Sequence, residues 1–229
     1  HPKDDKGLPV FNYSVAYDTD NKEPLFYEQY PGSIVDVSQL QFMLEKAKGY
    51  GYKKVGFILD RGYFCKENIQ YMDDCGYDFV IMVKGMSFLV NDLILKNKGK
   101  FENIRECGIR EYKCFGTTIK RQLYVSDTEE RYFHLYYSNQ KACAEQEQFE
   151  AKIDRMSKYL NSVKGKKVNI GNGFRDYFHL EIYEPDGTFL YAREKTEAVQ
   201  REMDLSGYFA IVTSKKMTAK EALELYKSR

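Results

Sequence analysis

The first 85 residues alternate between two hydrophobic periods, one typical of strands and one typical of helices. Apolar side chains at every second position predict strands, and apolar side chains every three or four residues predict helices. Two short runs are apolar on both faces, which predicts buried, central strands. The expected elements are strands at 11–17 and 24–30, a helix at 37–47, a strand at 55–59, a short helix at 69–75 and a strand at 77–83. This order, β-β-α-β-α-β, predicts a mixed sheet covered by helices.

Beyond Lys84 the pattern becomes rich in strands. We expect five of them, at 108–114, 118–126, 131–138, 177–183 and 188–192. Pro185-Asp186-Gly187 predicts a tight hairpin between the last two. One long helix is expected between Phe149 and Val163, because apolar residues recur there at spacings of four and three. Its apolar stripe could pair two protomers, but burial against its own β-sheet is the simpler explanation of the stripe.

The end of the chain returns to the α/β pattern. An apolar strand is expected at 207–213, and Thr218-x-x-Glu221 has the form of a capping box before a final helix. We therefore expect residues 1–85 and 205–229 to form an α/β core, interrupted by a β-rich insertion at 86–204 that contains the long helix.

Composition narrows the class of protein. The chain has 229 residues, 43% of them hydrophobic, and 35 basic residues nearly balance 34 acidic ones. This balance is typical of a folded protein and removes the usual argument for nucleic-acid binding, a strongly basic domain. Every 18-residue stretch carries charge, so no membrane span is expected, and the polar start does not resemble a secretory signal. These features predict a cytoplasmic protein.

The cysteines and histidines exclude several kinds of chemistry. Five cysteines without a Cys-x-x-Cys pair indicate reduced thiols, and the three histidines lack metal-ligand spacing. Zinc sites and histidine-based triads are therefore poor candidates, which leaves carboxylates, tyrosines and basic residues. Cys65 could be a reactive thiol, but a half-buried structural thiol fits its surroundings better.

Asp60 is the first candidate for function. It directly follows a fully apolar strand, and ligands in α/β sheets bind at the carboxyl ends of strands. Arg61 could hold a phosphate or a second carboxylate, and Gly62 allows a sharp turn. The alternative is structural, because an aspartate after a strand often caps the next helix.

Three segments resemble the DDE transposases that bacterial insertion sequences encode. In that family an apolar strand runs into Asp-Arg-Gly and an Asn-Ile pair follows on the next helix, as in residues 55–69 here. Residues 3–36 resemble the stretch after the family's first catalytic strand, and residues 207–229 resemble its strand and Tyr-x-x-Arg signature. The order and the separation of the three segments match as well.

This resemblance implies a ribonuclease-H-like fold in which two aspartates and a glutamate hold two Mg²⁺ or Mn²⁺ ions. Asp60 matches the second aspartate and would be a catalytic metal ligand, and Tyr226 and Arg229 of the signature would support the site. The implied reaction is DNA strand cleavage and transfer on transposon ends and target DNA. The implied setting is the bacterial nucleoid, with two copies joined in a synaptic complex.

The sequence also departs from the family pattern. The family's first aspartate lies on a strand before the segment that matches residues 1–6, and its glutamate lies about four residues beyond the signature arginine, Arg229. We therefore expect a fragment of a transposase that is inactive by itself. Two alternatives are a non-catalytic DNA-binding or assembly module with a vestigial acidic site, and a hydrolytic nuclease of the same fold.

Candidate DNA contacts lie where positive charge gathers. Residues 84–121 hold nine basic and four acidic residues. The candidates are Arg61, Lys96, Lys98, Lys100, Arg105, Arg110 and Lys113. A solvated face would show the same charges. Aromatic pairs at 132–133, 136–137 and 177–178 could stack on bases, but they are more simply explained as core residues.

Overall fold

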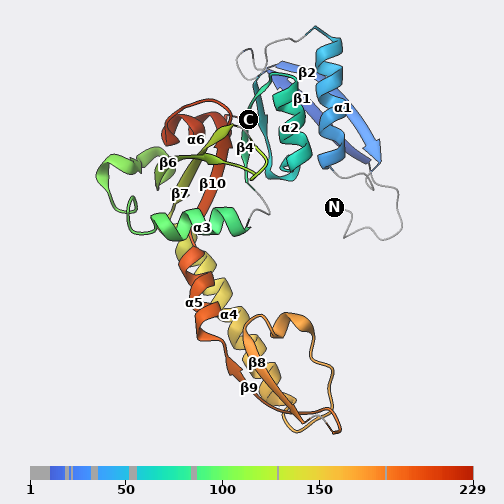
Figure 1. The fold of residues 1–229 in the computed structure, drawn as a ribbon, viewed down its shortest axis with the longest axis vertical. Coiled ribbons are helices and arrows are strands. Elements are labelled where there is room, and N and C mark those ends of the chain that lie inside the picture. The colour runs from blue at the N-terminus through green and yellow to red at the C-terminus, as the bar shows by residue number, and fades with distance from the viewer. Residues whose placement is uncertain are drawn as a thin grey trace. The chain divides into compact units, whose positions relative to one another are not determined.

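A computed structural model describes residues 11–18, 21, 23–31, 36–51, 56–83, 87–127, 129–183 and 185–228 (Figure 1). The strands are β1 (Phe11–Asp18), β2 (Glu23–Pro31), β3 (Gly56–Leu59), β4 (Asp78–Met82), β5 (Gly108–Ile109), β6 (Cys114–Gln122), β7 (Glu130–Tyr137), β8 (Phe178–Tyr183), β9 (Thr188–Glu194) and β10 (Tyr208–Thr213). The α-helices are α1 (Asp36–Gly49), α2 (Lys66–Asp74), α3 (Ser87–Asn97), α4 (Asn139–Ser162), α5 (Thr196–Leu205) and α6 (Ala219–Lys227).

The order predicted for the first 85 residues is confirmed. β1 and β2 form an antiparallel hairpin, α1 follows, and β3 and β4 flank α2. α2 ends at Asp74 with Cys75 as its C-cap, and Gly76 then adopts φ +68°, the left-handed conformation that glycine tolerates best after a helix. Ser33-x-x-Asp36 has the form of a capping box before α1, and Ser33 lies outside the described residues.

A six-stranded mixed sheet organises most of the strands in the order β3-β4-β10-β7-β6-β5. β3 runs parallel to β4, and β10 runs antiparallel to β4. With helices α2 and α6 packed against β4, this mixed α/β arrangement is consistent with the predicted ribonuclease-H-like fold. Residues 56–59 do form a strand, β3, but the prediction that this strand is central is wrong, because among the described strands β3 lies at one edge of the sheet.

The chain divides into two compact units. The first comprises residues 1–90, 116–136 and 209–229. Its interior is built from strands whose side chains are covered on both faces, with Phe79 and Ile81 of β4 and Ile211 of β10 almost fully buried. Helix α6 packs against β3 and β4 and buries Leu223 and Tyr226.

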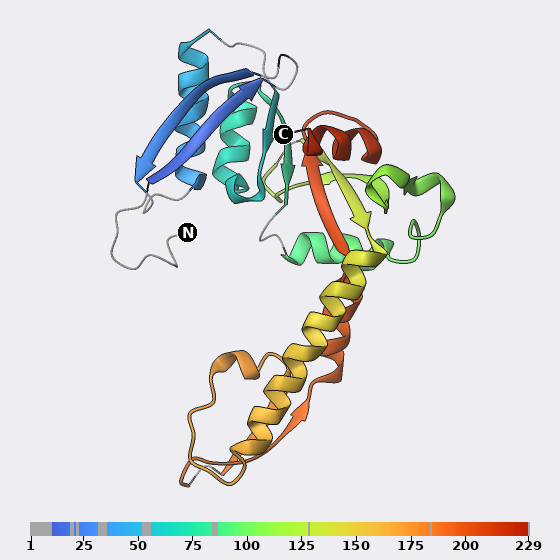
Figure 2. The same ribbon diagram turned by 180° about the vertical axis from the view of Figure 1, so that it is seen from behind.

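The second unit comprises residues 91–115 and 137–208. Within it, α4 and α5 lie side by side, and the β8-β9 hairpin lies along the later part of α4 (Figures 1 and 2). The apolar stripe of α4 packs into a core with residues of β8, β9 and α5, which confirms burial against its own unit. The buried members of this core are Ile153, Leu160, Val163, Ile170, Phe178, Phe189 and Val199. The predicted hairpin is also confirmed, with Gly187 at φ +76°.

Several predicted elements differ from the structure. The strand expected at 108–114 is interrupted by a 3₁₀ turn at Arg110–Tyr112, after which Lys113 adopts φ +50°. The strand expected at 118–126 begins earlier, at Cys114, and ends at Gln122. Helices α3 and α5 were not predicted. The core interpretation of the aromatic pairs holds for Phe133, Tyr136 and Phe178, each at most 4% exposed.

Candidate active site at Asp60

Asp60 stands where β3 ends and the chain turns. Its backbone is extended, with φ −72° and ψ 158°, and it caps the 3₁₀ turn Arg61–Tyr63. Its Oδ1 accepts a hydrogen bond from the Arg61 amide at 2.7 Å, and its carbonyl accepts one from the Tyr63 amide at 3.0 Å. Asp60 therefore has the capping role that was the structural alternative, while its side chain remains exposed.

A side chain of α2 holds the turn that follows Asp60. Asn68 is 1% exposed, and its Nδ2 donates to the Tyr63 carbonyl at 2.9 Å. Cys65 caps α2, because its Sγ accepts from the Asn68 amide at 3.4 Å. Cys65 is half-buried, and burial raises the pKa of its thiol, which disfavours the nucleophilic thiolate and fits a structural role. The asparagine of the motif's Asn-Ile pair thus fixes the backbone that follows Asp60.

Tyr226 reaches Asp60 from the last helix. Its hydroxyl donates to Asp60 Oδ1 at 3.2 Å, although the two residues are 166 positions apart. A complete capping box formed by Thr218 and Glu221 starts α6, and the buried face of the helix holds Tyr226 at 2% exposure. Hydrogen bonds to a carboxylate are stronger than bonds between neutral groups, so Tyr226 and the Arg61 amide orient a negatively charged Asp60.

The described residues offer an incomplete donor set for metal ions. A carboxylate is the hard oxygen ligand that Mg²⁺ and Mn²⁺ prefer. However, no group of three or more His, Cys, Asp or Glu with suitable geometry occurs in the described part of the chain. Within the described residues, Asp60 is therefore not part of a cluster of such ligands.

The candidate DNA contacts fall into two groups. Arg61 belongs to the first unit, and the six residues between Lys96 and Lys113 belong to the second. Lys96 and Lys98 form ion pairs with Asp92 and Asp204, which partly compensates their charge. Four others are exposed and form no ion pair within the described ranges: Lys100, Arg105, Arg110 and Lys113. Arg229 lies outside the described residues.

Three hydrogen-bonded polar side chains form a row across the sheet, with Thr118 exposed and His134 and Thr213 fully buried, and no local sequence pattern predicted this row. His134 is 0% exposed, with Nδ1 2.9 Å from Thr118 Oγ1 and Nε2 3.0 Å from Thr213 Oγ1. Since Thr213 donates its own proton to the Lys215 carbonyl at 2.7 Å, Nε2–H must donate to Thr213 and Nδ1 must accept from Thr118. Burial lowers the pKa of His134 to about 4 and keeps the ring neutral. The row spans β6, β7 and β10, so it can be found only once the strand order is known.

Fold and site together define a ribonuclease-H-like α/β protein with an oriented carboxylate at the end of a strand. The family described as "Transposase DDE domain" matches residues 1–229, and the chain belongs to this family. DDE transposases act on DNA and generally use divalent metal ions. No curated protein and no solved structure shows a significant match to the chain.

Proposed function

We propose that this chain belongs to the catalytic domain of an insertion-sequence transposase and that Asp60 is one of its metal ligands. The observation that carries the proposal is the hydrogen bond from Tyr226 to Asp60, which joins the two segments that resemble the family's second aspartate motif and its tyrosine signature. The family membership of the whole chain supports the same assignment.

Within this proposal, the residues of the chain position a carboxylate. The Arg61 amide and the Tyr226 hydroxyl both point at Asp60 Oδ1, and Asn68 fixes the turn that carries it. We propose Mg²⁺ or Mn²⁺ as the ion and place its remaining ligands outside the described residues. Because one carboxylate binds such ions weakly, we expect no strand cleavage from the purified 229-residue chain alone.

The proposed substrate also suggests where the protein acts. No helix of the described residues is both long and apolar enough to cross a membrane. We propose that transposon ends and target DNA are bound at the bacterial nucleoid, in a synaptic complex with two copies of the protein.

The test is metal-dependent cleavage of transposon-end DNA by the full-length protein. Asp60→Asn keeps the shape of the side chain but removes its charge, and we expect the cleavage rate to fall by about 1,000-fold or more. The matched control is Asp74→Asn, an exposed aspartate at the end of α2, which should cleave at nearly the wild-type rate.

Cleavage by Asp60→Asn at the wild-type rate would contradict the assignment of Asp60. A wild-type protein that binds DNA but never cleaves it would instead favour the non-catalytic module, and cleavage without strand transfer would favour the hydrolytic nuclease.

A further inference from the structure

Helix α4 has two charged flanks on either side of its buried stripe. At 100° per residue, Glu147, Glu150 and Asp154 fall on one flank. The opposite flank presents Gln148, Lys152, Arg155 and Tyr159, which we call the α4 basic flank. Lys141 and Lys158 form ion pairs with Glu145 and Asp154 one turn away on the same helix, whereas Lys152 and Arg155 form none within the described residues.

Positive charge continues from the α4 basic flank into the loop that follows. Residues 152–179 contain seven basic and two acidic residues, a net charge of +5 in a chain whose net charge is +1. All seven are exposed: Lys152, Arg155, Lys158, Lys164, Lys166, Lys167 and Arg175. Lys158 and Lys167 form ion pairs with Asp154 and Asp186, and the other five form none within the described part of the chain.

Aromatic rings support the cations of the α4 basic flank. Lys152 Nζ lies 4.5 Å from the centroid of Tyr177 and 5.9 Å from that of Phe149. The two rings meet edge to face at 5.3 Å, and Tyr159, 42% exposed, contacts Phe174 next along the surface. The rings position Lys152 without neutralising its charge.

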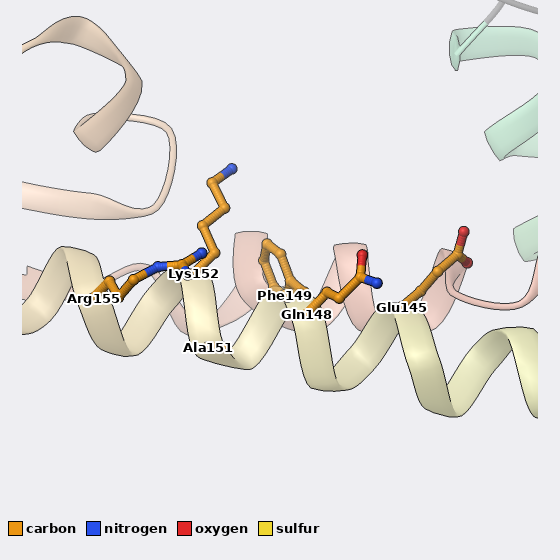
Figure 3. Close-up of a pocket in the computed structure, with 6 residues that line it drawn as sticks. All are labelled: Glu145, Gln148, Phe149, Ala151, Lys152 and Arg155. Atoms are coloured by element: carbon orange, nitrogen blue, oxygen red, sulfur yellow. The ribbon is translucent and has the colours of Figure 1, made fainter.

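A shallow hollow of about 480 Å³ lies on the α4 basic flank. Figure 3 shows Glu145, Gln148, Phe149, Ala151, Lys152 and Arg155 around it, with the long side chain of Lys152 rising beside Phe149. Its lining is largely apolar, and its charges are those of Lys152, Arg155 and Glu145, of which Glu145 is paired with Lys141. Lys152 lies over the rings and forms no ion pair within the described residues, so a phosphate group can reach its ammonium, whereas stacked bases would have to displace it.

We propose that the α4 basic flank binds the phosphate backbone of double-stranded DNA, at a surface separate from the candidates between Lys96 and Lys113. This inference rests on the proposed function for the identity of the partner and on charge complementarity for the surface. Contacts of this kind hold and orient a duplex without reading its sequence.

The test is fluorescence anisotropy of a labelled DNA duplex titrated with the 229-residue chain at several salt concentrations. We expect the double variant Lys152→Glu/Arg155→Glu to lower affinity about 10- to 100-fold at low salt. It should also reduce the slope of log affinity against log salt by about 2, one unit for each lost phosphate contact. The neutral variant Lys152→Gln/Arg155→Gln should show the same slope change with a smaller loss.

The matched control is Lys48→Glu/Lys220→Glu, which reverses two exposed charges on α1 and α6 and changes the net charge equally. It should leave the salt slope unchanged. An equal effect of both double variants would overturn the proposal, because net charge alone would then explain binding. Loss of binding to anionic phospholipid vesicles, with DNA binding unchanged, would overturn it in favour of a membrane surface. Because this assay needs no cleavage, its failure is distinguishable from a failure of Asp60→Asn to abolish cleavage.

Discussion

The turn at Asp60 and the α4 basic flank hold their charges in opposite ways. Asp60 is contacted by a backbone amide and by Tyr226, and its turn is fixed by a buried asparagine. Lys152 and Arg155 form no ion pair within the described ranges, and only ring faces steady Lys152. The difference fits the two roles that we propose, because a metal ligand needs a carboxylate in one position, whereas backbone binding needs only cations that can reach a phosphate.

The second unit is nevertheless tightly packed around Gly207, which lies between α5 and β10. Gly207 has φ +87°, and its amide donates to Glu145 Oε2 at 2.8 Å. A β-carbon there would lie 2.6 Å from that of Ala142 and 2.9 Å from Tyr137. The free cations of the α4 basic flank therefore do not reflect a loosely packed unit.

Gly207→Ala should produce the largest effect on stability. The left-handed backbone and the overpacking together should lower the free energy of unfolding by about 4 kcal/mol. Equilibrium urea unfolding measures this. Gly165→Ala is the matched control, since Gly165 has φ +77° and open space around it, and it should lose only about 1 kcal/mol. Equal losses at the two positions would show that packing around Gly207 contributes nothing.

His134 is a second polar group of the first unit that its hydrogen bonds hold in place, and its protonation should make stability depend on pH. The pKa of His134 is lowered in the folded protein from 6.5 to about 4, so the unfolded chain binds more protons between these values. Stability is therefore full above pH 6.5 and falls as the pH drops toward 4, by about 3 kcal/mol from this group.

The measurement is urea unfolding at pH 7, 5.5 and 4 for the wild type and His134→Gln. Glutamine keeps a donor and an acceptor but does not titrate, so the variant should lose about 3 kcal/mol less than the wild type between pH 7 and pH 4. Parallel pH profiles would mean that the ring is not held neutral in the sheet.

Tyr226→Phe should have the smallest effect on stability, because it keeps the buried ring and removes the hydrogen bond from the hydroxyl to Asp60. We expect a loss of about 1 kcal/mol in unfolding free energy and a roughly tenfold slower strand cleavage by the full-length protein. The control is Tyr71→Phe, whose hydroxyl makes a long 3.5 Å contact with Glu45 on the surface. If the two variants cleave equally fast, Tyr226 does not orient Asp60.

Sequence patterns predicted the elements that have a clear period. The stripe of α4 and the hairpin at Gly187 were both predicted, because each depends on local spacing or turn chemistry. Helix α3 was missed because apolar residues surround it, including Phe88, Leu93 and Ile94, so no single face stands out. Helix α5 was missed for the opposite reason, since Val199 is its one buried residue.

The position of β3 in the sheet and the polar row at His134 depend on strand order, which cannot be predicted from local sequence patterns. The doubly apolar run of β3 predicted a central strand, but helices can cover a strand at the end of the described sheet as well. The row of Thr118, His134 and Thr213 requires the order β6-β7-β10. Asp60 was found from its place after an apolar strand, and Tyr226 through the resemblance to the transposase signature.

The most direct test of the division between chemistry and binding is the single-turnover cleavage rate of the full-length protein at saturating protein concentration. Under this condition weaker DNA binding no longer limits the rate. Lys152→Glu/Arg155→Glu should then cleave within a few-fold of the wild type, whereas Asp60→Asn should stay about 1,000-fold slower. Cleavage by Asp60→Asn at the wild-type rate, or an equal loss in both variants, would contradict the account.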